Sequence, residues 1–531
     1  MQVHLLVNRG RALRWHLWVA DALSATGTYG VVFVPQSSST WGSLPTSCDL
    51  LLRLERLVFR FTGEHATDPV TIEGAGYRWV EQESGGRGAD LVINLSSDAF
   101  PDIAATTHVL TPLFDGAFGE TAAFAGFLDL RPVEIAVTDS ARPGLWWSAR
   151  PAIEQRQQLT PALDNVYARL AELIVQAVGK LGLSSEKSGQ VRSRASAELS
   201  AFSVRTTAVT FLFNKIQAGV QALIGRLLNE APRWSVAHRS WNGEPLMTNA
   251  CQNGRPFSVL PDDGRRYFAD PFVFSHKGTP YLFCEEYPFA QQRGVISVSN
   301  LKPDGRTFSP PEVVLDEQFH LSYPFVFTHN DEIWMIPETA QANRVALYRA
   351  VIFPKKWVCE SILIDGVCGY DATLVRRNER WWLLMTTRRW QSSSHDNLVI
   401  YTAESLIGPW TPMPGNPQLI DAKASRSAGG TWEYQGQLYR PAQDCSQTYG
   451  GWLSVCRIDR LELDQYAQTI VAVVTAMSGN TRLGIHTLTT GGGIEAIDVF
   501  GPMNDIRTAT LSVEVQSVDF KATIGDGPTE D

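Results

Sequence analysis

One pattern repeats along the second half of the chain: an apolar strand, a short polar turn, and a second strand rich in aromatic residues. The first copy, ADPFVFSHKGTPYLFCEEY, spans residues 269–287 and is followed by an outer strand at 294–300. Strands that alternate with turns and recur at a regular interval are typical of repeated β-sheet units. The later copies are SYPFVFTHNDEIWMIPETA (322–340), YDATLVRRNERWWLLMTTR (370–388) and SAGGTWEYQGQLYRPAQDC (427–445), with outer strands at 344–350, 397–403 and 451–459.

The spacing of these copies predicts a β-propeller. The equivalent residues Asp270, Tyr323, Asp371 and Ala428 are 53, 48 and 57 residues apart. This interval fits one four-stranded blade, which needs about 40–50 residues.

The two ends of the repeat region predict one further blade. An inner hairpin at 484–500 has no outer strands after it, whereas 233–240 and 256–261 look like outer strands with no hairpin before them. Joining them closes a ring of five blades over residues 233–502. A closed ring leaves few sheet edges exposed, which favours this arrangement.

The first part of the chain alternates short apolar runs with helical patterns, which predicts a mainly parallel, Rossmann-like α/β sheet. With 531 residues, the chain exceeds the roughly 250–300 at which single cores stop growing. The expected strands are 3–7, 30–34, 90–95 and 133–139, and the expected helices are 11–24 and 161–181. We therefore divide the chain into an α/β domain (1–181), a linker with a connector helix (182–232), the propeller (233–502) and a C-terminal tail (503–531).

Composition excludes several classes of protein. The helix expected at 206–228 either connects the domains or lies on a membrane, and its sparse cationic face favours the connector. A net charge of −9 leaves no basic stripe for nucleic acid. Seven cysteines without metal-ligand spacing suit a reducing compartment. No signal peptide or transmembrane segment is expected, so we predict a cytoplasmic protein. Its oligomeric state stays open.

Carboxylates occupy equivalent places in the repeat. Asp270 and Asp371 begin inner strands, and Glu285 and Glu338 both lie fifteen residues after the equivalent position of their repeat. Because a hairpin returns to the face where its first strand began, these acids should meet at one mouth of the ring. Mutual repulsion and burial would then separate their pKa values.

Such a pair suits glycosidic chemistry, in which one carboxyl donates a proton and another, ionised, activates water or attacks the anomeric carbon. We predict Asp270 as base or nucleophile and Glu338 as acid, with Asp371 in the catalytic group. The alternatives are a turn-capping role for Asp270 and a salt bridge from Glu338 to Arg440 or to another blade. The expected substrate-binding residues are Glu285, Glu286, His320, Tyr323, Trp382, Arg388, Arg426, Arg440 and His486, with Trp334, Trp381 and Trp390 as further stacking candidates and Arg389 competing with Arg388.

The phrases DPFVF, EIWMIPET, YDATLVRRNERWWLLMTT and GIHTLTTGGGIEAIDVF resemble a five-bladed propeller family. This family includes the N-terminal region of plant glucosamine inositolphosphorylceramide transferase and many bacterial proteins, and we expect a bacterial protein. More remotely, the propeller resembles five-bladed glycosidases of the arabinanase and invertase type. Their pattern implies that Asp270 is a catalytic Asp. This chain, however, has Tyr323 where they have a second Asp on blade two. Its Glu338 also lies on blade two, whereas their acid Glu lies on blade three.

The N-terminal part resembles a formyltransferase-like domain through GADLVINLS and THVLTPLFDGAFGETAAFAGFLDL. Formyl transfer is expected to need an Asn-x-His pair followed by Asp. Here only His108 and Asp115 are present nearby, so the resemblance implies a degenerate domain. The chain has no Gly-rich phosphate-binding motif, and we expect no cofactor. An axial divalent cation on the propeller is left open.

We therefore expect a glycoside hydrolase-like enzyme that acts on an oligosaccharide, polysaccharide or glycolipid. A glycosyl-transferring enzyme or a non-catalytic glycan-binding module in glycan or glycolipid assembly is the main alternative. A sugar N-formyltransferase is a third.

Overall fold

A computed structural model of the protein describes residues 1–36, 46–81, 89–96, 108–128, 132–142, 144–181, 232–241, 256–508 and 510–518. The chain forms two compact units. The first comprises Met1–Ile224 with the short segments Arg388–Ser393 and Leu419–Asp421, and the second comprises Gly225–Thr387, Ser394–Gln418 and Ala422–Asp531. The predicted linker and connector helix fall outside the described residues.

A six-stranded sheet forms the first unit, in the order β2-β1-β3-β4-β5-β6. The pairings of β1 with β2 and β3, and of β3 with β4, are parallel. The strands β5 and β6 extend the sheet in antiparallel fashion. The sheet is thus mixed, with its parallel part first along the chain. The bounds are β1 Gln2–Asn8, β2 Gly30–Gln36, β3 Leu91–Asn94, β4 Val109–Phe114, β5 Ile135–Asp139 and β6 Trp146–Ala149.

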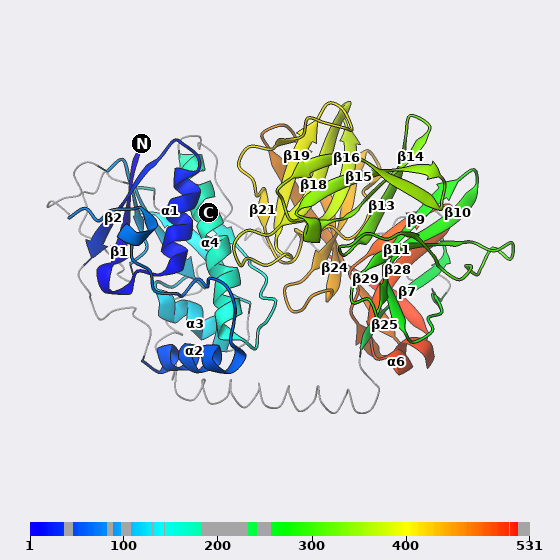
Figure 1. The fold of residues 1–531 in the computed structure, drawn as a ribbon, viewed down its shortest axis with the longest axis horizontal. Helices are drawn as coiled ribbons and strands as arrows, with labels where there is room; N and C mark the ends of the chain where they lie inside the picture. The colour runs from blue at the N-terminus through cyan, green and yellow to red at the C-terminus, as the bar shows by residue number, and fades with distance from the viewer. Residues whose placement is uncertain are drawn as a thin grey trace, which may run out of the picture. The chain divides into compact units, whose positions relative to one another are not determined.

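Helices pack on this sheet by their apolar faces (Figure 1). Leu163, Val166 and Leu170 are fully buried on one side of α4, as helical spacing requires. Tyr167 of α4 stacks on Trp15 of α1 with ring centroids 4.8 Å apart. The helices are α1 Arg14–Ser24, α2 Thr46–Phe59, α3 Glu120–Leu128 and α4 Leu159–Leu181, with short 3₁₀ turns η1 Arg9–Arg11 and η2 Glu73–Ala75. The α/β character is as expected, whereas the likeness to formyltransferases stays a prediction.

The second unit contains five antiparallel sheets, which are the five blades of the predicted propeller. Blade one is β9 Arg266–His276, β10 Thr279–Pro288, β11 Val295–Asn300 and β12 Glu312–Leu315. Blade two is β13 Ser322–His329, β14 Glu332–Glu338, β15 Arg344–Ile352 and β16 Lys356–Asp365, with η5 Ala340–Ala342. Blade three is β17 Gly369–Arg377, β18 Arg380–Thr387, β19 Asn397–Ala403, β20 Thr411–Pro412 and β21 Leu419–Ile420. Blade four is β22 Trp432–Tyr434, β23 Gln437–Asp444, β24 Trp452–Leu461, β25 Tyr466–Ser478 and β26 Thr481–Leu483.

Blade five confirms the predicted ring closure. Its order is β27-β28-β7-β8, so the late strands β27 Leu488–Gly491 and β28 Ile494–Gly501 pair with the early strands β7 Arg233–Ser240 and β8 Ser258–Val259. In Figure 1 the green β7 lies beside the red β28. Within this pair Arg239 Nε donates to Glu495 Oε2 at 2.5 Å, and both side chains are buried. The closure therefore has a buried ion pair in addition to its backbone ladder.

The segment after residue 502 corrects one expectation. Instead of a loose tail, it begins with α6 Met503–Thr508 and continues as β29 Leu511–Ser517, which pairs with β25. Leu511 and Val513 are buried in the core of blades four and five. The apolar–polar alternation of LSVEVQS explains this strand. Residues 519–531 lie outside the described part.

Five cysteines in the described residues carry free thiols. Cys284, Cys445 and Cys456 are buried, as packing residues would be. Within the described ranges, the structure contains no helix with both the length and the apolar character needed to cross a membrane.

Candidate active site

The inner strands of three blades begin with the same unusual backbone. Asp270, Tyr323 and Asp371 adopt left-handed conformations, with φ of 48°, 45° and 51°. Each lies at a break in the strand register, where two residues oppose one on the next strand. Such bulges redirect side chains, and strain in non-glycine residues is often found at functional sites. The repeat thus turns three equivalent side chains in the same way.

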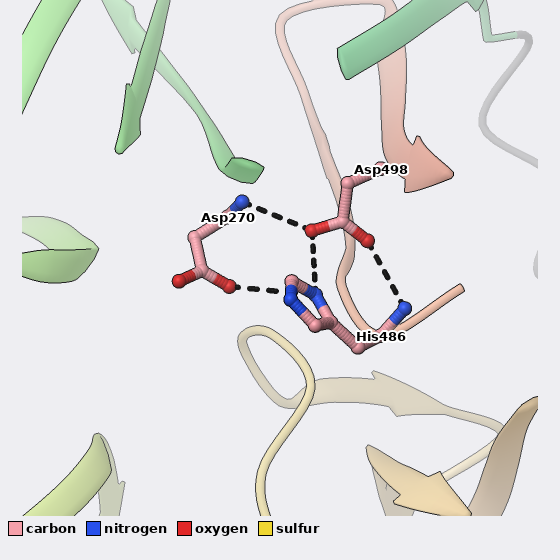
Figure 2. A group of neighbouring side chains, drawn as sticks. All are labelled: Asp270, His486 and Asp498. Atoms are coloured by element: carbon pink, nitrogen blue, oxygen red, sulfur yellow. Dashed lines mark hydrogen bonds and ion pairs between the residues drawn. The ribbon is translucent and has the colours of Figure 1, made fainter. Parts of the chain in front are cut away.

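Asp270 lies in a network with blade five. Its Oδ1 accepts a hydrogen bond from Thr487 Oγ1 at 2.8 Å, and its Oδ2 accepts one from the Tyr323 N–H at 3.2 Å. Its own N–H donates to Asp498 Oδ2 at 2.9 Å. Figure 2 shows how Asp270, Asp498 and His486 face one another. The predicted residues Asp270 and His486 are therefore brought together.

His486 stands between the two acids. Its Nδ1 lies 2.6 Å from Asp498 Oδ2 and 3.6 Å from Asp270 Oδ1. Burial alone would lower the pKa of His486, but Asp498 and Asp270 raise it above its usual value. Burial raises the pKa of Asp270 to about 6; His486 opposes this shift, and Asp371 and Asp498 add to it. Asp270 can therefore be ionised at neutral pH.

These three side chains are also the candidate metal ligands in the described part of the protein. Asp270, His486 and Asp498 each offer one ligand atom, and those atoms lie within 4.8 Å of one another. Carboxylate and imidazole groups suit several divalent cations. The hydrogen bonds within the group also hold it together by themselves.

A second network centres on Arg426. Its Nε donates to Asp371 Oδ2 at 2.5 Å and its Nη2 donates to Asp371 Oδ1 at 3.3 Å, a bidentate pair. Gln443 Nε2 also donates to Asp371 Oδ2, at 2.8 Å. Glu338 Oε2 lies 3.6 Å from Arg426 Nη2. The ion partner of Glu338 is thus Arg426, from outside blade two, and not Arg440; a salt bridge from Glu338 to Arg440 or to another blade was the alternative considered from the sequence.

Glu338 is the least satisfied acid of this network. It is 7 % exposed, and its Oε2 has no hydrogen-bond partner among the residues that the structure describes. Burial raises the pKa of Glu338 well above its usual value; Asp371 and Asp270 add to the shift, and Arg426 opposes it. A neutral carboxylic acid is the form that this environment favours.

Glu285 completes the group of acids. Burial raises the pKa of Glu285 well above its usual range, and Asp270, Glu338, Asp498 and Asp371 all raise it further. Five acids from four blades therefore act on one another at one end of the ring. With Arg426 and His486 as the buried cations beside them, protonating one or two of these acids reduces the repulsion.

His320 flanks Glu285. Its Nε2 lies 3.6 Å from Glu285 Oε1, and its Nδ1 accepts a hydrogen bond from the Gly294 N–H at 2.9 Å. Burial lowers the pKa of His320, which favours the neutral ring. A Cβ on Gly294 would lie 2.4 Å from the Leu321 carbonyl oxygen and 2.8 Å from Glu285 Oε1, so only glycine fits there.

Three predicted binding residues have structural partners instead. Tyr323 is fully buried, and its hydroxyl contacts Thr373 Oγ1 at 2.8 Å and the Gly429 N–H at 2.8 Å. Glu286 is held by Arg266 and by Ser297 Oγ. Arg440 donates to the carbonyls of Ala424 and Ser425 at 3.0 and 2.7 Å, and so fixes the segment that carries Arg426.

Two other predicted positions lie away from this cluster. Arg388 belongs to the first unit, where it pairs with Glu154 at 3.4 Å. Trp382 is 3 % exposed, so its ring offers no face to a ligand. Trp334 and Trp381 are equally part of the core, and Trp390 stacks on Trp18 in the first unit. Nearly every residue of β14 and β18 is buried, so Trp334, Trp381 and Trp382 are core residues rather than the expected stacking surface.

Several residues of the cluster were not predicted from the sequence. Asp498 lies on β28 and binds the backbone N–H groups of His486 and Thr487 at 3.0 and 2.8 Å. His395 Nδ1 lies 2.8 Å from Arg426 Nη1. An aspartate inside the apolar run EAIDVF was the signal for Asp498, whereas no pattern marks His395.

The candidate residues of the first unit do not form a triad. His108 Nδ1 pairs with Asp139 Oδ2 at 2.7 Å, and Asp115 Oδ1 accepts from the Glu134 N–H at 2.9 Å. A small pocket nearby is lined by Trp15, Leu95, Ser96, Thr111, Pro112, Phe114, Phe118, Gly119, Glu120 and Tyr167.

The second unit is thus a five-bladed propeller with a buried carboxylate cluster at one end of its ring. Residues 230–486 match the family described as glucosamine inositolphosphorylceramide transferase 1, N-terminal. The resemblance predicted from the sequence is confirmed over that part of the chain. The match includes Asp270, Glu338, Asp371 and Arg426.

Plant proteins are similar to the same region. The chain is 34 % identical over 254 residues to the glucosamine inositolphosphorylceramide transferase 1 of Oryza sativa subsp. japonica, covering 47 % of this chain and 32 % of that protein. It is 33 % identical over 247 residues to the protein of that name from Arabidopsis thaliana, covering 46 % and 30 %. The chain therefore spans about a third of the length of these relatives. Their plant origin goes against the expected bacterial source, and the cytoplasmic location gains no support from them.

The chain is also similar to solved structures with which it shares little sequence identity. A thermostable family-43 glycoside hydrolase is 11 % identical with a TM-score of 0.32, covering 40 % of this chain and 81 % of that chain. The α-L-arabinanase of Cellvibrio cellulosa complexed with arabinohexaose is 13 % identical with a TM-score of 0.30, covering 43 % and 83 %.

Proposed function

We propose that the protein is a carbohydrate-active enzyme that breaks a glycosidic bond with the acids of its propeller. The observation that carries this proposal is Glu338, a buried carboxyl in the same cluster as Asp270, whose pKa is raised and whose Oε2 has no hydrogen-bond partner among the described residues. Two carboxyl groups with separated pKa values fit the acid and base roles of glycosidic chemistry.

In this proposal Glu338 donates its proton to the departing glycosidic oxygen as the bond to the anomeric carbon breaks. Asp270, ionised, either takes a proton from an attacking water or attacks the anomeric carbon itself. Arg426 holds Asp371 beside Glu338, and the negative charge of Asp371 helps to keep Glu338 protonated. Blade five holds Asp270 through Thr487 and His486.

The name of the plant relatives supports a second candidate, transfer of the sugar to another molecule in place of water. These relatives are named glucosamine inositolphosphorylceramide transferase 1, and the family that matches this chain is the N-terminal region of that transferase. A glycolipid or oligosaccharide acceptor would then take the position of the water. A non-catalytic glycan-binding role is the remaining candidate, since Asp371 has its oxygens filled by Arg426 and Gln443.

Turnover assays test the proposal directly. Purified protein is screened against nitrophenyl glycosides and natural oligosaccharides, with and without a glycolipid acceptor. For the substrate that reacts, Asp270→Asn is expected to lower turnover by about 10²-fold or more, because the uncharged amide cannot act as a base. A protein that binds a glycan but turns over none of the panel is a binding module, and the enzymatic proposal is then rejected.

The pH dependence of turnover follows from the two acids. Asp270 must be ionised, so turnover should rise as the pH passes through about 6. Glu338 must be protonated, so turnover should fall again as the pH passes through its raised pKa. Measuring kcat/KM, which reports the groups of the free enzyme, from about pH 4 to about pH 10 should give a bell-shaped profile. A profile with no alkaline limb would remove Glu338 from the acid role.

A further inference from the structure

One exposed aromatic side chain lies over the buried cluster. Tyr449 is 40 % exposed, in contrast to the acids and cations around it. Its ring stacks on His395 with centroids 4.7 Å apart and an angle of 22°, and it lies 5.3 Å from the ring of His486. The Arg426 guanidinium carbon is 5.4 Å from its centroid. Tyr449 therefore contacts both the Asp270 network and the Arg426 network.

The loop that carries Tyr449 is fixed in place. It follows β23 of blade four and reaches blade five, where the Ile485 N–H donates to the Gly450 carbonyl at 2.7 Å. Gly450 has φ of 62°, and a Cβ there would lie 2.5 Å from the ring of Trp234. Trp234 in turn stacks on His486, 3.8 Å between centroids. The loop can approach this closely because position 450 is glycine.

An exposed aromatic ring that is held in place beside charged groups is suited to binding a sugar ring. The C–H face of a sugar ring is apolar, while its hydroxyl edge needs hydrogen-bond partners. Binding sites for small polar ligands combine aromatic faces with a few placed polar groups. Tyr449 offers the face, and the acids and Arg426 below it offer the polar partners.

Resting on the proposed function, we propose that Tyr449 is the stacking platform for an uncharged sugar residue next to the bond that reacts. The excess of acids over cations in the cluster disfavours an acidic sugar at this position. The platform also explains why blade four extends a loop across to blade five.

Affinity measurements test the platform. Binding of neutral arabino-, xylo-, galacto- and gluco-oligosaccharides is measured by calorimetry in a Glu338→Gln background, in which turnover is expected to be slow. Tyr449→Ala is expected to weaken binding by about tenfold, because the stacking surface and its apolar contact with the sugar are lost. Tyr449→Phe should stay within about twofold of the parent, because stacking needs the ring and not the hydroxyl.

Tyr434→Ala is the matched control. Tyr434 lies in the same blade but at the turn before β23, at the opposite end of that strand from the Tyr449 loop. It should leave affinity unchanged. The melting temperature of Tyr449→Ala is measured alongside, and a loss of affinity supports the platform only where the variant is folded at the temperature of the assay.

The possible outcomes distinguish the stacking role of Tyr449 from the proposed enzymatic function on which it rests. A parent that binds while Tyr449→Ala binds equally well rejects the platform alone, as does Tyr449→Phe losing as much affinity as Tyr449→Ala. A parent that binds none of these sugars, when the native protein turns over none either, rejects both proposals. Equal binding of a uronic-acid oligosaccharide would overturn the expected preference for uncharged sugars.

Discussion

Replacing Glu338 by Gln should lower turnover of a reactive glycan by about 10²-fold or more while leaving its binding intact. The amide has the same shape as the neutral acid but has no proton to give to the departing oxygen. Because Glu338 is buried and its Oε2 lacks a hydrogen-bond partner in the described structure, the change removes chemistry with little effect on packing. Steady-state kinetics and calorimetry on the same preparation give both values.

A matched control lies on the same strand. Glu332 begins β14 at its other end and is exposed, so Glu332→Gln should keep full turnover. Substrates with good leaving groups, such as nitrophenyl glycosides, should suffer less from Glu338→Gln than natural sugars, since they need less protonation. Equal losses on both kinds of substrate would point to a structural role for Glu338.

The second large effect concerns stability. Replacing Arg426 by Met should lower the free energy of unfolding of the second unit by about 3–5 kcal/mol, because Asp371 is left as a buried charge without its cation. Denaturant unfolding followed by near-UV circular dichroism measures the change. Adding Asp371→Asn to Arg426→Met should restore part of the loss, since the unpaired charge is then removed.

An exposed ion pair provides the comparison. Arg349 bonds Glu360 at 3.0 Å with about a third of both side chains exposed. Arg349→Met should therefore cost about 1 kcal/mol or less. If the two variants lost the same stability, the Arg426–Asp371 pair would not be the support that its geometry suggests.

The sequence predicted the blades well because strand alternation and turn residues are local signals. The hairpin copies fall on the observed inner strands, and the predicted assembly of blade five from both ends is correct. The equivalence of Glu285 and Glu338 also holds: each pairs with the residue just before the inner-strand bulge of its blade. The regular strand register of the repeat therefore predicted that Glu285 and Glu338 occupy equivalent strand positions.

The remaining parts of the site depend on loops, which periodicity does not describe. Arg426 reaches Asp371 from one loop, and His395 contacts Arg426 from another loop earlier in the chain. Arg388 was predicted to bind substrate together with Arg426, yet it belongs to the first unit. Tyr323, where the remotely similar glycosidases have an Asp, uses its N–H for Asp270 and its hydroxyl for blades three and four, and composition could not reveal this.

The closure of blade five also bears on how the protein is made. Arg239 and Glu495 are 256 residues apart, so the first strand of the blade leaves the ribosome long before its partner exists. The same late hairpin brings His486 and Asp498 to Asp270. A nascent chain therefore keeps an open sheet edge and an incomplete acid cluster until its final blade is synthesised. Under the proposed function, the start of activity is then tied to the completion of folding.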